Sequence, residues 1–167
     1  MCERIFITLG SQKFQFNRLL KAVDELCEKE IIKSQNVFAQ IGYSDYIPKN
    51  YKYENFLDRD KFGMEMGKAD IVITHGGTGA IIGAVKLGKK VIAVPRLAKY
   101  GEHVDDHQLQ LIKQFDDLNL IYSCKATEDL EIALKTVRNT KYASYVSNTK
   151  NIIDSIEEFI KEIEKLV

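Results

Sequence analysis

The sequence has few cysteines, and they show none of the spacings on which cysteine-based sites depend. The chain contains three, Cys2, Cys27 and Cys124, an odd number that is widely spaced. Zinc sites and disulfide frameworks need closely spaced or paired cysteines. The pattern therefore indicates neither, and it suits a reducing cytoplasm.

An excess of charge of one sign is also missing. Lysine plus arginine and aspartate plus glutamate each number 24, so the formal net charge is zero. Proteins that bind nucleic acid usually carry a basic surface that neutralises phosphates, and binding to anionic lipid likewise requires a basic cluster. The balance predicts no nucleic-acid partner and weakens the case for direct membrane binding.

Long apolar runs are absent as well. The opening residues, MCERIFITLG, lack the charged head and extended apolar stretch of a signal peptide, and no run approaches the roughly 20 residues of a membrane span. The length suits one ordinary hydrophobic core. We therefore expect a cytoplasmic chain with a single domain over residues 1–167.

Short apolar runs alternate with amphipathic segments along the whole chain. Apolar runs rich in β-branched residues predict strands at 4–9, 36–42, 51–56, 70–75, 90–95 and 120–124. Helical spacing of apolar residues predicts helices at 17–30, 58–68, 78–87, 103–118, 127–139 and 148–167. The alternation predicts an α/β fold, a doubly wound parallel sheet with helices on both faces. Ligands of such sheets bind beyond the carboxyl ends of the strands.

A loop with three glycines, HGGTG, joins the strand at 70–75 to the next helix. Gly76, Gly77 and Gly79 would let the backbone approach a ligand closely, and a helix N-terminus offers free N–H groups to a diphosphate. A glycine-rich connection between tightly packed elements is the alternative, and it stays open because isolated glycine motifs are weak signals. The sequence has no G-x-G-x-x-G after the first strand and no P-loop lysine, which disfavours dinucleotide and ATP chemistry.

Two further groups of polar residues fall at the same edge of the sheet. His75 ends the strand at 70–75 and would point into the crevice, although a single histidine is usually structural. If the helix in EHVDDHQ begins near His103, its first turn presents His107 and Gln108 to the crevice. Asp105 and its neighbour Asp106 suit a helix N-terminus, and an acid beside a glutamine can bind sugar hydroxyls.

A metal site is the weaker interpretation of the same residues. His103 and His107 have the four-residue helical spacing of a zinc protease, but Val104 stands where the general base belongs. The acidic pair at 58–60 lies at a helix start, where Asp58 as an N-cap is the simpler explanation. We therefore expect no metal and no cofactor.

The motif order ITLGSQ, HGGTG, GKKVIAVP, EHVDDHQ resembles the C-terminal, donor-binding half of family 28 glycosyltransferases, which have the GT-B fold. More closely, it resembles the small subunit of split transferases in that family. One relative adds the second GlcNAc to a dolichol-linked sugar in eukaryotes. The nearer match is bacterial, in capsule and exopolysaccharide synthesis, typically a β-1,4-galactosyltransferase that acts on a lipid-linked glucose.

The resemblance implies a role for each matching position. Residues expected near the donor diphosphate or sugar are Gly10, Ser11, Gln12, Gly76, Gly77, Thr78, Gly79, Asp106, His107 and Gln108. Catalytic candidates are His75 and, as a general base, His103. Many relatives carry a glutamate on the helix after the glycine loop, where it binds the ribose hydroxyls. This sequence has Gly83 there, which leaves Glu102 as the candidate ribose contact.

The resemblance also implies a complete activity: inverting transfer of a hexose, galactose in the nearer match, from a UDP-sugar to a lipid-linked saccharide. A membrane-anchored partner would hold the acceptor, so the chain would work at the inner face of the membrane. The helix dipole and side-chain donors would stabilise the departing diphosphate without a metal. The helix at 148–167 would either dock on that partner or pack on its own domain. A non-catalytic partner subunit and a stand-alone nucleotide-sugar enzyme are the alternatives.

Overall fold

A computed structural model describes residues 3–147 and 153. Its strands form one six-stranded sheet in the order β3-β2-β1-β4-β5-β6, and every pair is parallel. The strands are β1 (Ile5–Thr8), β2 (Val37–Gln40), β3 (Lys52–Glu54), β4 (Ile71–Thr74), β5 (Lys90–Ala93) and β6 (Tyr122–Ser123). The predicted fold class, a doubly wound parallel sheet, is confirmed.

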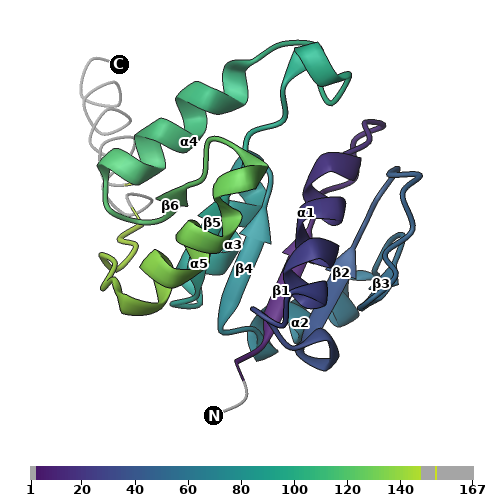
Figure 1. The fold of residues 1–167 in the computed structure, drawn as a ribbon. Helices are drawn as coiled ribbons and strands as arrows, with labels where there is room; N and C mark the ends of the chain where they lie inside the picture. Colours follow the sequence, from purple (N-terminus) through teal and green to yellow (C-terminus); the bar gives the residue numbers. More distant parts are fainter. Residues whose placement is uncertain (1–2, 148–152, 154–167) are drawn as a thin grey trace, which may run out of the picture.

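Helices cover both faces of the sheet. On one face lie α1 (Asn17–Glu28) and α5 (Leu130–Asn139); on the other lie α2 (Arg59–Lys68), α3 (Thr78–Lys86) and α4 (His107–Asp117). Figure 1 shows α1 and α5 in front of the strands, with α2 and α3 behind them. Successive strand residues face opposite ways, so Ile5 and Ile7 join the α1–α5 core and Phe6 joins the other. Among the described helices, none has the length and apolarity that crossing a bilayer requires.

The order of the strands reverses between β1 and β4. The chain builds outward from β1 through β2 to β3, then returns and builds the other way through β4, β5 and β6. The loops that follow β1 and β4 therefore diverge to opposite faces of the sheet, and they leave a crevice at the carboxyl edge. This is the position at which open α/β sheets bind ligands.

The structure confirms some of the predicted helix boundaries and corrects others. Asp58 is the N-cap of α2, and its carboxylate accepts a hydrogen bond from the backbone N–H of Lys61 at 2.8 Å. The helix expected from His103 instead begins at His107. Asp106 explains the delay, because its carboxylate accepts from the backbone N–H of Ala98 at 2.8 Å and holds the preceding loop folded back. The helix predicted over 148–167 lies outside the described residues, apart from residue 153.

Asp24 is a buried carboxylate that fastens the loop between β2 and β3 onto α1. It accepts from the Tyr46 hydroxyl at 2.7 Å and from the backbone N–H groups of Lys49 and Asn50, each at 2.9 Å. Asp24→Ala is expected to lower the free energy of unfolding by about 2–3 kcal/mol, because it removes a buried, charged acceptor that holds three hydrogen bonds from this loop. Glu25→Ala, at the exposed neighbouring acid, is the matched control with an expected change below about 0.5 kcal/mol. Urea unfolding measures both, and equal losses would contradict this role for Asp24.

Candidate functional site

Three loops meet at the carboxyl edge of the sheet, one after each of β1, β4 and β5. The backbone N–H groups of Gly76 and Arg96 both donate to Oε1 of Gln108, at 3.0 and 3.1 Å. Nη2 of Arg96 donates to the carbonyl of Leu9 at 2.6 Å. These contacts tie the three loops to one another and to the first turn of α4, so the sequence-predicted segments do converge.

The imidazole of His75 is packed between two of the predicted glycines. A Cβ atom built on Gly10 would lie 2.6 Å from Nε2 of His75, and one built on Gly77 would lie 2.2 Å from Cε1. Neither distance is tolerable for a real side chain, and Gly10 also has a positive φ of 73°. Gly10 and Gly77 are therefore required by the protein's own packing, which is the alternative that the sequence left open.

Burial keeps His75 neutral. The residue is 8% exposed, and desolvation, followed by electrostatic interactions with Arg96 and His103, lowers the pKa of His75 to about 3. An unperturbed histidine has a pKa near 6.5. His75 therefore carries a neutral imidazole throughout the physiological range, and its predicted catalytic role, which stays a prediction, would be that of a neutral group.

The depressed pKa of His75 makes stability depend on pH with a defined sign. Below pH 6.5 the unfolded chain binds a proton that the folded chain excludes, so the free energy of unfolding falls as pH drops toward 3, by about 1.4 kcal/mol per pH unit. Between pH 7 and 5 we expect the parent chain to lose about 2 kcal/mol more than His75→Gln. Urea titrations of both proteins at the two pH values measure the difference, and parallel losses would contradict it.

Gln108 lies under the loops rather than over the crevice. The helical-face argument presents both His107 and Gln108 to a ligand, but the structure exposes His107 and leaves Gln108 only 3% exposed. A Cβ built on Gly76 would lie 2.6 Å from Cβ of Gln108, so this glycine is also required by packing. Its hydrogen bonds to the N–H groups of Gly76 and Arg96 hold the side chain of Gln108 inward. Its predicted contact with the donor sugar remains a prediction.

Glu102 is fully buried, and its carboxylate is already paired. Oε1 accepts from Nε of Arg18 at 2.9 Å, and Oε2 accepts from Nη2 of Arg18 at 2.9 Å and from the backbone N–H of Leu97 at 3.0 Å. Such a bidentate pair holds both partners in a fixed geometry. The ribose contact of Glu102 stays a prediction. To make that contact, the carboxylate would have to break its ion pair with Arg18.

Arg96 is the residue of this region that sequence reasoning missed. Its guanidinium is buried at 1% exposure, lies 5.5 Å from the ring centroid of Phe16, and has no hydrogen-bond partner for Nε or Nη1 among the described residues. Burial lowers the pKa of Arg96 to about 10, and the charge of Glu102 opposes that shift. The one sequence signal was an arginine placed directly after a buried parallel strand, at its carboxyl end.

The N-terminus of α3 is open at the crevice. Its N-cap is Gly77, and no side chain among the described residues caps the helix. Thr78 and Gly79 are exposed, and a Cβ built on Gly79 would meet nothing within 4 Å. The same holds for Gly83 one turn later. The first N–H groups of a helix have no partner within the helix, so this end can accept an anion.

The remaining predicted residues lie at the rim. Ser11, Gln12, Asp106 and His107 are exposed, and His103 is half-buried. The ring of His103 packs on that of Phe14, with centroids 5.1 Å apart. A separate hollow of about 460 Å³ opens beside α1, lined by residues that include Arg18, Lys21 and Tyr100 and none from the glycine loop.

An open parallel sheet whose strand order reverses beside an uncapped, glycine-rich helix N-terminus defines a Rossmann-like domain. The fold is that of solved glycosyltransferases: the kitacinnamycin enzyme superposes with a TM-score of 0.62 at 18% identity, covering 83% of this chain and 35% of that one. The chain belongs to the glycosyltransferase family 28 C-terminal domain, whose family model matches residues 4–167.

The chain is also similar to curated proteins named UDP-N-acetylglucosamine transferase subunit ALG13. The Homo sapiens protein is 28% identical over 126 residues, which are 72% of this chain and 11% of that protein. The Candida glabrata protein is 25% identical over 143 residues, 83% of this chain and 64% of that one. A solution structure of ALG13 has a TM-score of 0.56 at 20% identity, covering 85% and 88% of the two chains. The chain thus spans about a tenth of the length of the Homo sapiens protein and somewhat less than two thirds of the length of the Candida glabrata protein.

Proposed function

We propose that this chain is the donor-binding subunit of a two-component inverting glycosyltransferase that moves a hexose from a UDP-sugar to a lipid-linked saccharide. One observation carries the proposal: the uncapped N-terminus of α3 opens at the switch point of the sheet, with free space over Gly79. A diphosphate carries the charge and the oxygen acceptors that such a helix end binds best.

The chemistry of transfer places its largest demand on the leaving group. As the bond between sugar and diphosphate breaks, negative charge grows on the diphosphate, and fixed N–H donors that face it lower the barrier. In this proposal the backbone N–H groups of Thr78 and Gly79 and the hydroxyl of Thr78 supply those donors. The proposal needs no metal ion for transfer.

The donor sugar is proposed with less support than the diphosphate site. Resemblance to the capsule and exopolysaccharide subunits favours galactose, whereas the relatives that match by sequence are named for a UDP-N-acetylglucosamine transferase. Asp106 and His107 lie at the start of α4, and both are exposed. These are the side chains proposed to contact the sugar. Galactose, glucose and GlcNAc donors must therefore be compared directly.

The acceptor is proposed to lie on a second, membrane-anchored subunit. The relatives are named as subunits, which supports a partner. The partner would hold this chain at the inner face of the membrane and would supply part of the acceptor site. His103, half-buried at the rim of the crevice, is the proposed general base on this chain.

A reconstitution experiment tests the proposal. The chain is co-expressed with a candidate membrane-anchored partner from the same genome, and membranes receive radiolabelled UDP-galactose, UDP-glucose or UDP-GlcNAc. Transfer of one sugar to lipid by the pair, with little from either protein alone, is the expected result. Thr78→Ala should reduce transfer, and Asp60→Asn, on the exposed first turn of α2, should not.

The alternatives give different results in the same assay. A non-catalytic partner subunit predicts full transfer with His75→Ala and Thr78→Ala present in the complex. A stand-alone nucleotide-sugar enzyme predicts turnover of the UDP-sugar by the isolated chain. Either result would overturn the proposed function.

A further inference from the structure

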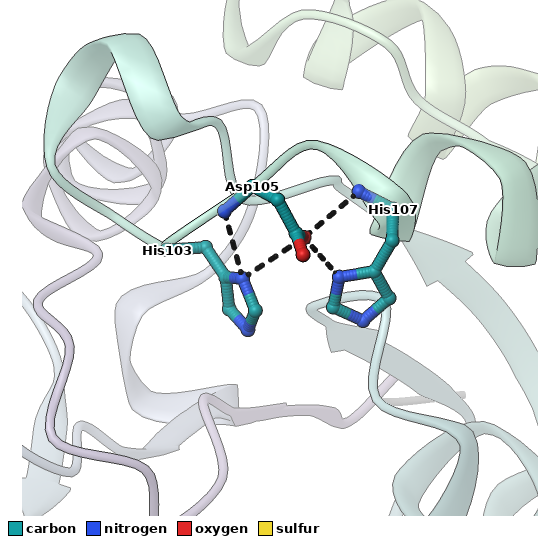
Figure 2. Close-up of side chains that lie close together, drawn as sticks. All are labelled: His103, Asp105 and His107. Carbon is teal, nitrogen blue, oxygen red and sulfur yellow. Dashed lines mark hydrogen bonds and ion pairs between the residues drawn. The ribbon is translucent and has the colours of Figure 1, made fainter.

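Three potential metal ligands converge in the turn that leads into α4. One ring nitrogen each from His103 and His107 and a carboxylate oxygen of Asp105 all lie within 4.8 Å of one another. Figure 2 shows both imidazole rings turning their Nδ1 edge toward the same carboxylate. The residues alternate along the chain, so the turn itself, rather than a helix face, brings them together.

Both imidazoles contact the same side of Asp105. The backbone N–H of Asp105 lies 3.4 Å from Nδ1 of His103. Oδ1 of Asp105 lies 3.3 Å from the same nitrogen, and Nδ1 of His107 also contacts that oxygen. One ring nitrogen of each histidine therefore faces the same carboxylate oxygen, and a divalent cation bound among them would engage both nitrogen lone pairs and the carboxylate.

The spacing suits a tetrahedral ion. Zinc bonds to imidazole nitrogen and carboxylate oxygen at about 2.0–2.2 Å, which places neighbouring ligand atoms of a tetrahedron about 3.3 Å apart. The separation of 3.3 Å between Nδ1 of His103 and Oδ1 of Asp105 matches that edge. Nδ1 of His107 contacts the same oxygen directly, so this second pair must move apart to admit the ion. Two imidazoles and one carboxylate also form a ligand set that borderline divalent metals such as Zn²⁺ prefer.

We propose that His103, Asp105 and His107 form a binding site for a divalent transition-metal ion, with Zn²⁺ as its test ion. The sequence-based expectation of no metal considered these histidines as helix neighbours with Val104 between them; the turn gives them a third ligand, Asp105, instead. Three protein ligands leave a fourth position for water or another oxygen. Asp105 and His107 are 57% and 47% exposed, so an ion can enter from solvent.

The bound ion would fix the start of α4. His107 is the first residue of that helix and adjoins Gln108, which joins the loops after β4 and β5. The ring of Phe14 packs on His103 and supports its orientation. This inference does not rest on the proposed function, and Zn²⁺ bound to His103 would exclude the role of that imidazole as general base. The metal-binding assay and the transfer assay therefore report on the two proposals separately.

Zinc binding to the full-length, tag-free chain tests the inference. Cys2→Ser serves as the background in every protein, which removes a competing thiol. Metal-free protein competes with a chromophoric chelator for Zn²⁺, and one equivalent is expected to bind. Asp105→Ala and His107→Gln should each weaken binding at least tenfold, by analogy with the loss that even outer-shell changes cause. Asp60→Ala, at an exposed acid of α2, is the matched control and should bind as the parent does.

Histidine ring spectra of the same protein locate the ion. Added Zn²⁺ should shift the Nδ1 resonances of His103 and His107, leave the ring of His75 unchanged, and raise the melting temperature. Equal affinity in the parent and both ligand variants, binding that does not saturate, or a shift confined to His75 would each overturn the inference. Circular dichroism shows whether each variant is folded, and only the affinities of folded variants are compared.

Discussion

Gly77→Ala is expected to reduce sugar transfer by the two-component complex about 100-fold, the scale on which a displacement of about 1 Å in a catalytic site acts. The new methyl group would lie 2.2 Å from Cε1 of His75. The backbone of Gly77, with φ −78° and ψ 117°, suits any residue, so the effect comes from the collision and not from the dihedral angles. His75 is buried and cannot move aside cheaply, so the glycine loop has to shift. Overpacking of this kind also lowers the free energy of unfolding, by about 1–3 kcal/mol.

Gly79→Ala is the matched control for the stability effect of Gly77→Ala only, because Gly79 belongs to the proposed diphosphate site. It places a methyl group two residues later, where nothing lies within 4 Å, and alanine favours the helix by up to about 1 kcal/mol. Its melting temperature should equal or exceed that of the parent. Thermal unfolding and the membrane transfer assay measure both variants. If Gly77→Ala keeps the stability and the transfer activity of the parent, the close packing of His75 against Gly77 is contradicted.

Gln108→Ala is expected to cost about 2–4 kcal/mol of stability and most of the transfer activity. The substitution removes the one side-chain oxygen that accepts from the N–H groups of Gly76 and Arg96, and each buried donor left without a partner costs about 1–3 kcal/mol. The loops after β4 and β5 then lose their connection. Activity should fall through misplacement of the glycine loop, whether or not Gln108 also contacts the donor sugar.

Gln110→Ala separates that effect from a general weakening of α4. Gln110 is exposed on the same helix, so its loss should change the free energy of unfolding by less than about 0.5 kcal/mol. Urea unfolding and amide exchange at Gly76 provide the measurements. Equal behaviour of the two variants would show that Gln108 does not hold the loops.

Hydrophobic patterning was sufficient to predict the fold. Buried parallel strands are short and mostly apolar, as in Ile71–Thr74. When such strands alternate with amphipathic helices and every crossover is right-handed, few topologies remain possible. The three loops of the site could be predicted for the same reason, because each follows the carboxyl end of a strand. The N-cap at Asp58 carried a local signal that needs no tertiary context.

The contacts inside the site could not be predicted in the same way. Gln108 reaches Gly76 across 32 residues and Arg18 reaches Glu102 across 84, and no periodicity records such pairings. The glycines illustrate the limit. Gly76 and Gly77 are explained by neighbouring side chains, whereas Gly79 has open space, and only the structure separates the two cases. The late start of α4 likewise depends on Asp106 bonding back to Ala98.

A titration of the ¹⁵N-labelled chain with UDP tests the central claim most directly, because amide spectra detect even weak binding at each residue. The account predicts saturable shifts that are largest at the open end of α3, at Thr78 and Gly79, with smaller ones at Ser11 and Gln12. Shifts that instead cluster around Arg18 and Tyr100 in the hollow beside α1, or a spectrum that UDP leaves unchanged, would contradict it.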